Sequence, residues 1–473
     1  MSWLSYLPDG SLRVLRQLIL RQGRRMSAES LLAKSRRRAL AAALDAAKHS
    51  AAYQVLLREQ GLSPEKLGLD TPWSSLPVLT KSNTFGRFGL DELSRPVPTR
   101  SIADVLTSSG RGGNSFGYRL TIRDVHEESW FDIDLGLQDV FDVDRKRTLL
   151  VNCLPMGVVF RSKAVTVANV SVREDMACSI LRDIGPKFDQ TIVCTDPLFV
   201  RRLLDEGEQA GVNWAALKTS FIMGEEMLVE TQRDYIAARI GLDLEHESHR
   251  LIGSSYGIGE LGLNLFFETR ETIRIRRLLG TDAQLQAVLK WQQHEGGLPS
   301  VFCYNPLRTC VEVLEPDSDG YGELCLTLLG GDPVIPLPRF ATGDRGRLVS
   351  SEEAQRAAQI VGQAAPWLPM VMVQGRLKDR PNAFPAVERI KEILYQDHQV
   401  ADRLTGAFRL SRSDLGRVLL TVQAAQVTPD QQQRLQAHLT EAGLNQVDLA
   451  WAPEQPFGWG ATLDYERKFP YAG

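Results

Sequence analysis

The feature that most constrains the fold of this chain is an alternation of short apolar runs with helical stretches, which begins near Thr107. Apolar or β-branched runs lie at 148–154, 191–195 and 219–223, and helical patterns lie at 198–210 and 229–240. Strands that alternate with helices in this way are typical of βαβ units around a mostly parallel sheet. We therefore expect an α/β protein.

The length of 473 residues predicts more than one domain, because a single core stops growing near ~250–300 residues. Short strands are expected at 334–340, 345–349, 371–373, 418–423 and 447–451, and helices at 385–395 and 429–442. We expect a large N-terminal domain over 1–374, mainly helical over 1–100 and then built from mixed or parallel sheets and helices. A small, mobile α+β domain is expected over 375–473.

Composition excludes several classes of protein. A net charge of −3 argues against a dedicated nucleic-acid binder. The six cysteines are scattered without a framework, as in reducing compartments. We see no signal peptide, and no apolar run reaches the ~20 residues that a membrane span requires. A cytoplasmic protein is expected.

The segment 12–40 is locally basic, with nine basic residues against one acid, Glu29. Leu12, Leu15 and Ile19 recur at helical spacing, which predicts a basic amphipathic helix followed by a second helix. Such a face can bind a membrane surface or an acidic partner. We favour the commoner case, a solvated face of a helix that is docked on the main domain.

A Gly- and Ser-rich segment at 107–117 is the first candidate for chemistry. Backbone N–H groups of such a loop can turn inward together and bind phosphate oxygens, and serine hydroxyls add donors. The Walker A spacing is absent, so the segment is not a P-loop. The alternative is an ordinary surface loop without a ligand.

Two further segments combine residues that suit a nucleotide. In 256–260, Tyr256 can stack on a base and Glu260 can hold a magnesium ion near phosphates. In 342–344, the short carboxylate of Asp344, held in a tight turn, can accept hydrogen bonds from two ribose hydroxyls. The alternatives are a strand-to-turn crossing and a simple hairpin.

Taken in order, these segments resemble the signature motifs of the adenylate-forming superfamily, most closely its phenylacetate–coenzyme A ligase-like branch. The segments that carry the resemblance are 108–114, 224–226, 256–260, 342–344, 375–379, 384–388 and Lys468 with Phe469, and together they span about residues 80 to 470. The sequence departs from the family pattern at Arg111, Gly112 and Asn114 in the phosphate loop, at Gly259 before the glutamate, at Arg467, and in a shortened loop at 380–383.

The resemblance implies a role for each matched residue. The phosphates would be bound by Ser108, Ser109, Gly110, Arg111 and Gly113, and the magnesium ion by Glu260. Tyr256 and Gly257 would contact the adenine, Asp344 and Arg376 would bind the ribose, and Gly224 and Glu225 would line the acid pocket. Lys378 would be the hinge, and Lys468 would bridge the substrate carboxylate and the α-phosphate.

The activity that the resemblance implies is ATP- and Mg²⁺-dependent conversion of a carboxylic acid, aromatic or acyl, to an acyl-adenylate. Transfer to the thiol of coenzyme A or an acyl carrier protein would follow. Because several motif residues are lost, the chain could instead be a non-catalytic relative that binds a nucleotide or acyl group as a scaffold.

A zinc site at Cys303 and Cys310 with His246 and His249 is a further alternative. The spacing of these residues fits no familiar tetrahedral pattern, so buried structural cysteines are favoured.

Overall fold

The structure, a computed structural model, describes residues 3–108, 116–155, 157–292, 297–330, 333–377, 384–413, 416–424 and 427–452, together with Tyr465, Phe469 and Tyr471. The chain divides into two compact units, each assembled from segments that are far apart in the sequence. Unit 1 comprises Met1–Val140, Ser255–Trp291 and Val301–Leu377, and unit 2 comprises Phe141–Ser254, Gln292–Ser300 and Lys378–Gly473.

Unit 1 is built around an antiparallel sheet with a core of its own. Its strands are β1 (Ile102–Thr107), β2 (Tyr118–Ile122), the end of β7 (Ile252–Ile258), β8 (Gly262–Phe267), β9 (Ser300–Tyr304), β10 (Thr309–Leu314), β11 (Gly322–Leu328), β12 (Phe340–Val349) and β13 (Met370–Arg376). The helices are α1 (Asp9–Arg24), α2 (Ala28–His49), α3 (Ala51–Glu59), α4 (Leu90–Leu93), α5 (Arg123–Phe141), α9 (Arg270–Leu279), α10 (Ala283–Val288) and α11 (Ser351–Val361). The strand order is β10-β11-β12-β13-β9-β8-β7, and β1 pairs separately with β2.

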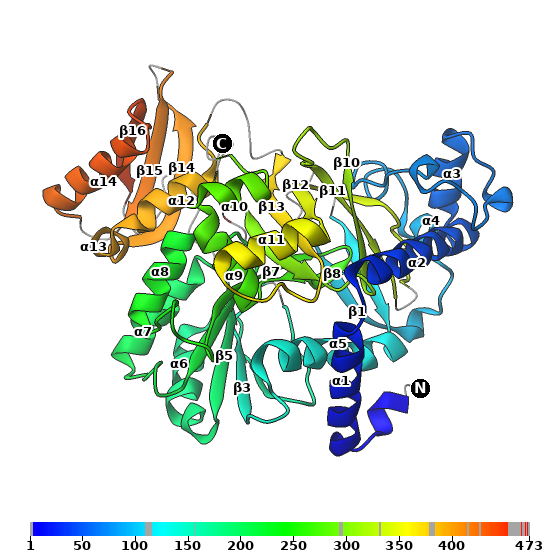
Figure 1. Ribbon diagram of the computed structural model, residues 1–473, viewed down its shortest axis with the longest axis horizontal. Helices are drawn as coiled ribbons and strands as arrows, with labels where there is room; N and C mark the ends of the chain where they lie inside the picture. The colour runs from blue at the N-terminus through cyan, green and yellow to red at the C-terminus, as the bar shows by residue number, and fades with distance from the viewer. Residues whose placement is uncertain are drawn as a thin grey trace. The chain divides into compact units, whose positions relative to one another are not determined.

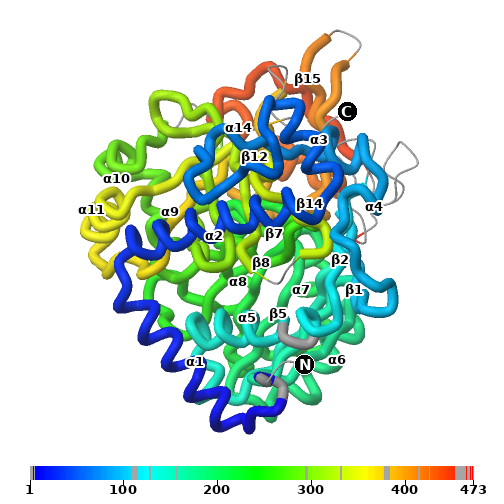
Figure 2. The backbone as a smooth tube through the Cα atoms, turned by 90° about the vertical axis from the view of Figure 1, so that its right-hand side faces the viewer, coloured from blue at the N-terminus to red at the C-terminus, as the bar shows by residue number. Residues whose placement is uncertain are grey.

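The basic N-terminal helix is docked, as expected. Its Leu12 packs against Trp130 and Phe131 of α5, and its Arg16 lies 3.8 Å from Asp134 with both side chains buried. Figure 2 shows α1 beside α5. One face of α1 is therefore used for packing inside unit 1. None of the helices in the described part of the chain is long and apolar enough to cross a membrane.

Unit 2 contains the parallel sheet that the sequence alternation predicts (Figure 1). Its strands are β3 (Thr148–Asn152), β4 (Thr166–Asn169), β5 (Gln190–Thr195), β6 (Thr219–Met223) and the start of β7, in the order β4-β3-β5-β6-β7. Every pair is parallel. The helices α6 (Glu174–Asp183), α7 (Phe199–Gln209) and α8 (Glu230–Arg239) alternate with the strands.

The C-terminal segment forms a small sheet of its own inside unit 2, in the order β14-β15-β16. Its elements are α12 (Val387–Gln396), α13 (His398–Ala401), β14 (Leu404–Arg412), β15 (Val418–Ala424), α14 (Pro429–Glu441) and β16 (Val447–Ala452). The expected α/β fold class is thus confirmed, and the C-terminal segment combines a small sheet with helices, as expected for an α+β arrangement. The strand expected at 334–340 is wrong, because 333–339 has no strand and β12 begins only at Phe340.

Candidate functional site

The predicted phosphate loop begins and ends at two neighbouring residues of unit 1. Ser108 follows β1, and its backbone N–H donates to the carbonyl of Gly117 at 3.0 Å. The N–H of Gly117 in turn donates to Ser108 Oγ at 3.0 Å. The two ends of the loop are therefore closed on each other. Ser109, Gly110, Arg111 and Gly113 lie outside the described residues, so their roles stay predictions.

Glu260 lies next to the hydrogen-bonded pair of Ser108 and Gly117. It is 4% exposed, and its Oε1 is 2.6 Å from Lys81 Nζ. Lys81 Nζ also donates to Ser108 Oγ at 3.1 Å. The structure therefore brings together Ser108 and Glu260, as the sequence predicts, and adds Lys81, which sequence reasoning missed. A single lysine in a turn after Thr80 has no periodicity or motif that would have revealed it.

Two glycines make this close packing possible. A Cβ atom on Gly259 would lie 2.8 Å from Ser108 Cα, and one on Gly117 would lie 2.2 Å from Glu260 Oε1. Real Cβ atoms do not approach backbone or buried carboxylate atoms so closely. The glycine that replaces the usual hydroxyl residue before the glutamate is thus explained, because a side chain at 259 would push Ser108 away.

The surroundings of Glu260 suit a single cation. Mg²⁺ is usually bound by one or two carboxylates together with substrate phosphates, and here the one carboxylate is buried and paired with the Lys81 ammonium. Among the described residues, no group of three or more His, Cys, Asp and Glu side chains could hold a metal. Lys81 contacts this carboxylate through Oε1, and the magnesium role of Glu260 stays a prediction.

The predicted nucleotide residues Tyr256, Asp344 and Arg376 converge in unit 1. Tyr256 Oη donates to Asp344 Oδ2 at 2.6 Å, and Arg376 Nε lies 3.9 Å from Asp344 Oδ1. Asp344 of β12 is directly opposite Arg376 of β13 in the ladder. The ring of Tyr256 stacks on Phe266 at 4.8 Å between centroids. Burial, with the nearby Asp344 carboxylate, raises the pKa of Tyr256 well above its usual range.

Asp344 lies within a strand and not at the end of a hairpin. The register of the β12–β13 ladder shifts between Asp344 and Gly346, which marks a bulge. Gly343 has a φ of 77°, and its N–H donates to Glu323 Oε1 at 2.9 Å. The tight-turn and hairpin expectations for 342–344 are therefore wrong, and the bulge takes the place of the turn in aiming the carboxylate.

Gly257 is fixed by a close approach between β7 and β8. A Cβ atom there would lie 2.9 Å from Leu263 Cα. The Tyr-Gly pair of the motif thus has a local physical reason, because only glycine lets the two strands come this near each other after Tyr256.

Gly224 and Glu225 lie in unit 2, just after β6. Gly224 N–H donates to the carbonyl of Thr195 at 2.8 Å, and Glu225 has a φ of 67°. The next residue, Glu226, accepts hydrogen bonds on Oε2 from Lys391 Nζ at 2.7 Å and from Tyr471 Oη at 2.6 Å. The predicted acid-pocket residues therefore stand at the carboxyl end of a parallel strand, where ligands of α/β proteins commonly bind.

A second buried carboxyl group follows the neighbouring strand. Asp196 comes directly after β5, and its Oδ1 accepts from the N–H groups of Leu198 and Phe199 at 2.8 and 3.1 Å. Burial, and then the carboxylate of Glu226, raise the pKa of Asp196 to about 7. Asp196 carries no motif, so sequence reasoning did not single it out.

The zinc alternative finds no support. All six cysteines are buried and free, and burial raises the pKa of Cys303 and Cys310. The prediction of buried structural cysteines is confirmed. Lys378 and Lys468 lie outside the described residues, and their hinge and catalytic roles stay predictions.

Comparison with solved structures shows the class of fold. The chain is similar to 2-hydroxyisobutyryl-CoA ligase in the postadenylation state: with 2-HIB-AMP the TM-score is 0.63 at 14% identity, and with R3-HIB-AMP it is 0.62 at 13%. Each match covers 94% of this chain and 89% of that ligase. The same ligase with 2-HIB-AMP and CoA, in the thioesterification state, gives 0.53 at 14%, covering 95% and 90%.

No protein-family profile and no curated protein matches the sequence. The likeness to solved structures therefore establishes the fold, which is that of adenylate-forming ligases. The fold expected from the sequence motifs is confirmed.

Proposed function

We propose that this protein is an adenylate-forming ligase that activates a carboxylic acid with ATP. The observation that carries the proposal is the contact of Tyr256 with Asp344 at 2.6 Å, with Arg376 opposite Asp344 in the ladder. These three residues are distant in the sequence and were predicted together as nucleotide ligands. A ligase of the same fold has been captured with an acyl-AMP intermediate, which supports the proposal.

In the reaction, an oxygen of the substrate carboxylate attacks the α-phosphorus of ATP. The bond to the β-phosphate breaks, and pyrophosphate leaves with the electron pair. Negative charge on the phosphate oxygens must be met by donors that are already in place. Lys81 and Ser108 stand at the base of the phosphate loop and supply an ammonium and a hydroxyl, and Arg111 and Lys468 would add further cations.

The nucleoside would be held by Tyr256, Asp344 and Arg376. Asp344 would accept hydrogen bonds from the ribose hydroxyls, and a carboxylate acceptor makes these bonds stronger than neutral ones. Arg376 would add a donor. One face of the Tyr256 ring is covered by Phe266, and the adenine would stack on the other face.

Mg²⁺ would accompany ATP as its phosphate complex, and no step is assigned to a metal on Glu260. Gly224 and Glu225 would line the acid pocket.

We further propose a second step in which the acyl group passes to a thiol. Coenzyme A is favoured as the acceptor, because the similar ligase has been captured with 2-HIB-AMP and CoA; an acyl carrier protein is the alternative. A cytoplasmic location, an aromatic acid of the phenylacetate type and a domain boundary at 374/375 are parts of the same proposal.

A scaffold that binds a nucleotide without catalysis is the second candidate. It is favoured by the departures at Arg111, Gly112 and Asn114, where the phosphate loop of the family that the sequence resembles has two threonines and a lysine. Such a protein would bind ATP and would not exchange pyrophosphate into it.

The test is ATP-dependent hydroxamate formation with a panel of carboxylic acids, aromatic, hydroxylated and aliphatic, followed by pyrophosphate exchange with the best acid. Calorimetric titration with ATP is run on the same protein. Exchange with at least one acid supports the ligase. Binding of ATP without exchange for any acid would support the scaffold instead.

A further inference from the structure

The first helix, α1, is held against α5 in both of its halves. In the first half, Arg16 lies 3.8 Å from Asp134, and both side chains are buried. In the last turn, Arg24 Nη2 lies 2.6 Å from Asp139 Oδ1. Because α1 cannot turn about its own axis while these contacts hold, the opposite side of the helix presents a fixed set of side chains.

That opposite side carries a stripe of four exposed residues. Positions 14, 18, 21 and 25 follow the spacing that places residues above one another on a helix. They are occupied by Val14, Leu18, Arg21 and Arg25, all of them exposed. Arg25 is the C-cap residue and keeps helical backbone angles. This set, the outer stripe of α1, is about 16 Å long at a rise of 1.5 Å per residue.

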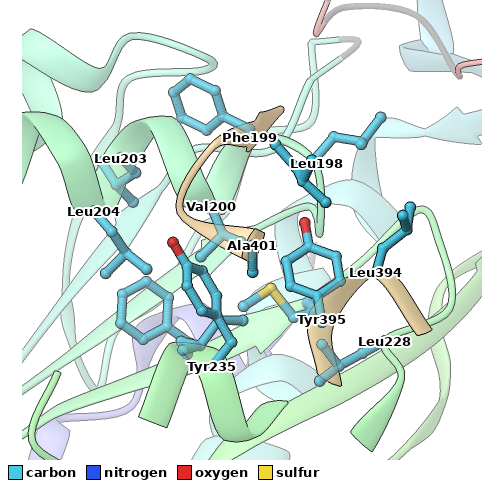
Figure 3. Close-up of a cluster of buried hydrophobic side chains, with 14 of the residues drawn as sticks. Leu198, Phe199, Val200, Leu203, Leu204, Leu228, Tyr235, Leu394, Tyr395 and Ala401 are labelled. Carbon is cyan, nitrogen blue, oxygen red and sulfur yellow. The ribbon is translucent and has the colours of Figure 1, made fainter. Parts of the chain in front are cut away.

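The aliphatic side chains of the outer stripe lie in the open, unlike those of the cores. Figure 3 shows the usual case in unit 2, where Leu203 and Tyr235 lie inside a hydrophobic cluster. In unit 1, Val14 and Leu18 are 56% and 55% exposed. Two more large apolar or aromatic side chains that are exposed lie nearby in the sequence, and these are Tyr6 and Ile19. Exposed apolar side chains that gather on one element mark an interaction site.

The same part of the chain is basic and contains no acidic residue. Within 10–28 there are five arginines and no aspartate or glutamate. Two of these arginines are paired with α5. The other three, Arg13, Arg21 and Arg25, are exposed and form no ion pair with any residue that the structure describes. The outer stripe therefore combines aliphatic groups with arginines whose charge is not neutralised.

A lipid surface that contains anionic headgroups satisfies both kinds of side chain. The apolar side chains of a helix that lies in the interface enter the boundary with the acyl chains, and its basic side chains bind anionic headgroups. Arginine in particular binds phosphate with two parallel hydrogen bonds. Tyrosine is enriched at the same depth, because its ring is apolar and its hydroxyl is polar. Tyr6, 72% exposed, precedes α1 directly.

An acidic protein partner fits the outer stripe less well. Acidic side chains would neutralise the arginines, but Val14 and Leu18 would stay in water unless the partner also offered an apolar groove. Anionic lipid provides the charge and the apolar medium together.

We propose that the outer stripe of α1 binds the surface of a membrane that contains anionic lipids, with the helix lying parallel to that surface. This role is compatible with the docking of α1, because the two contacts use opposite sides of the helix. It goes beyond the ligase function and does not depend on it, since no residue of the stripe belongs to the nucleotide or acid site.

Co-sedimentation of the full-length protein with lipid vesicles tests the proposal. The vesicles consist of phosphatidylcholine alone, or of phosphatidylcholine with about 30% phosphatidylglycerol. We expect the anionic vesicles to be bound at least about tenfold more tightly than the neutral ones. Raising the salt from about 0.1 M to about 0.5 M should reduce this difference, because salt screens the charges. No binding, or equal binding to both kinds of vesicle, would overturn the proposal.

Two double variants separate the two parts of the stripe. Val14→Gln with Leu18→Gln removes the aliphatic groups, and Arg21→Gln with Arg25→Gln removes the charges; glutamine keeps helix propensity in both. Each should lower binding to anionic vesicles by about tenfold or more, because each removes one of the two attractions. The melting temperatures should stay close to that of the wild type, since all four side chains are exposed.

The matched control is Lys48→Gln with Lys66→Gln, which removes the same charge from exposed positions outside α1. Lys48 stands at the far end of α2, about 30 Å along that helix from its start near α1. Since this exceeds the screening length of about 8–10 Å, binding should stay within about twofold of the wild type. If the control loses as much binding as the arginine variant, the attraction comes from net charge alone, and the outer stripe is not the site.

A second copy of this chain is the rival occupant of the stripe. The mass of the protein in solution is therefore measured for the wild type and for Val14→Gln with Leu18→Gln. A dimer that only the wild type forms, together with no binding of anionic vesicles, would assign the stripe to self-association and overturn the proposal. Vesicle binding needs no substrate, so a protein that adenylates no acid would refute the ligase function and leave this test intact.

Discussion

Lys81 forms an ion pair with the buried carboxylate of Glu260, with Nζ 2.6 Å from Oε1, at the base of the predicted phosphate loop. The same ammonium donates to Ser108. One lysine therefore connects the carboxylate to the first residue of the loop, at the position where the resemblance places a magnesium ion.

This contact predicts two separable effects of Lys81→Met. Breaking a buried pair by removing one partner costs about 3–5 kcal/mol of stability, so the melting temperature should fall. Loss of a preorganised donor should also lower pyrophosphate exchange by about 10²–10³-fold. The control is the double variant Lys81→Met with Glu260→Gln, which removes the uncompensated charge. It should regain stability without regaining exchange. Full exchange in the double variant would make Lys81 a structural residue only.

A second prediction concerns the nucleoside contacts. Asp344→Asn keeps the size of the side chain and removes its charge, and hydrogen bonds to charged groups contribute about 1.5–3 kcal/mol. Affinity for ATP, measured by calorimetric titration, should therefore fall by about 10- to 100-fold. Discrimination against 2′-deoxy-ATP should shrink as well. The matched control is Asp175→Asn, which loses an exposed ion pair with Arg173 in unit 2 and should bind ATP normally. Unchanged affinity in folded Asp344→Asn would remove this residue from the ribose site.

The fold was predictable where strands are continuous and apolar. Every residue of β3 and β5 is buried, so their sequences show the apolar runs of a parallel sheet. The strand expected at 334–340 contains Pro336 and Pro338, which have no N–H for a ladder. Conversely, the sequence pattern did not predict β14, because the pairing of this strand with β15 changes register between Leu404 and Phe408, around Gly406.

The site was predictable only where residues form a contiguous motif. Tyr256, Asp344 and Arg376 stood in recognisable segments, and the ladder of β12 and β13 brings two of them face to face. Lys81 and Lys391 stand in no motif. Each acquires its role from a carboxylate far along the chain, Glu260 and Glu226 respectively, and no local pattern encodes such a pairing.

A third prediction follows from the motif resemblance at the end of the chain. Lys468→Ala should keep ATP affinity within a few-fold, whereas pyrophosphate exchange should fall by about 10²–10³-fold, because a cation that meets developing charge is lost. Lys66→Ala, at an exposed lysine of unit 1, serves as the control for a lost positive charge. A Lys468→Ala protein with normal exchange would exclude this lysine from the mechanism.

The last prediction concerns the pH dependence of stability. The pKa of Asp196 is about 7 in the folded protein, against an ordinary value of 3.8, because the carboxyl group is buried. Between these two values the folded state holds a proton that the unfolded state has released. The stabilisation is therefore fully present below about pH 4 and is lost as the pH rises through about 7. Asp196→Asn cannot ionise and keeps an oxygen for the N–H groups of Leu198 and Phe199.

The melting temperature of Asp196→Asn, relative to that of the wild type, should thus increase from pH 5 to pH 8, since only the wild type must bury a charge at pH 8. Asp175→Asn is the control, because exposed Asp175 is paired with Arg173 and its pKa is lowered to about 2. Its difference from the wild type should be the same at both pH values. If the difference for Asp196→Asn is equally independent of pH, then Asp196 is already ionised in the folded protein at pH 5. Its burial beside Glu226 would then have to be compensated by a cation or by water.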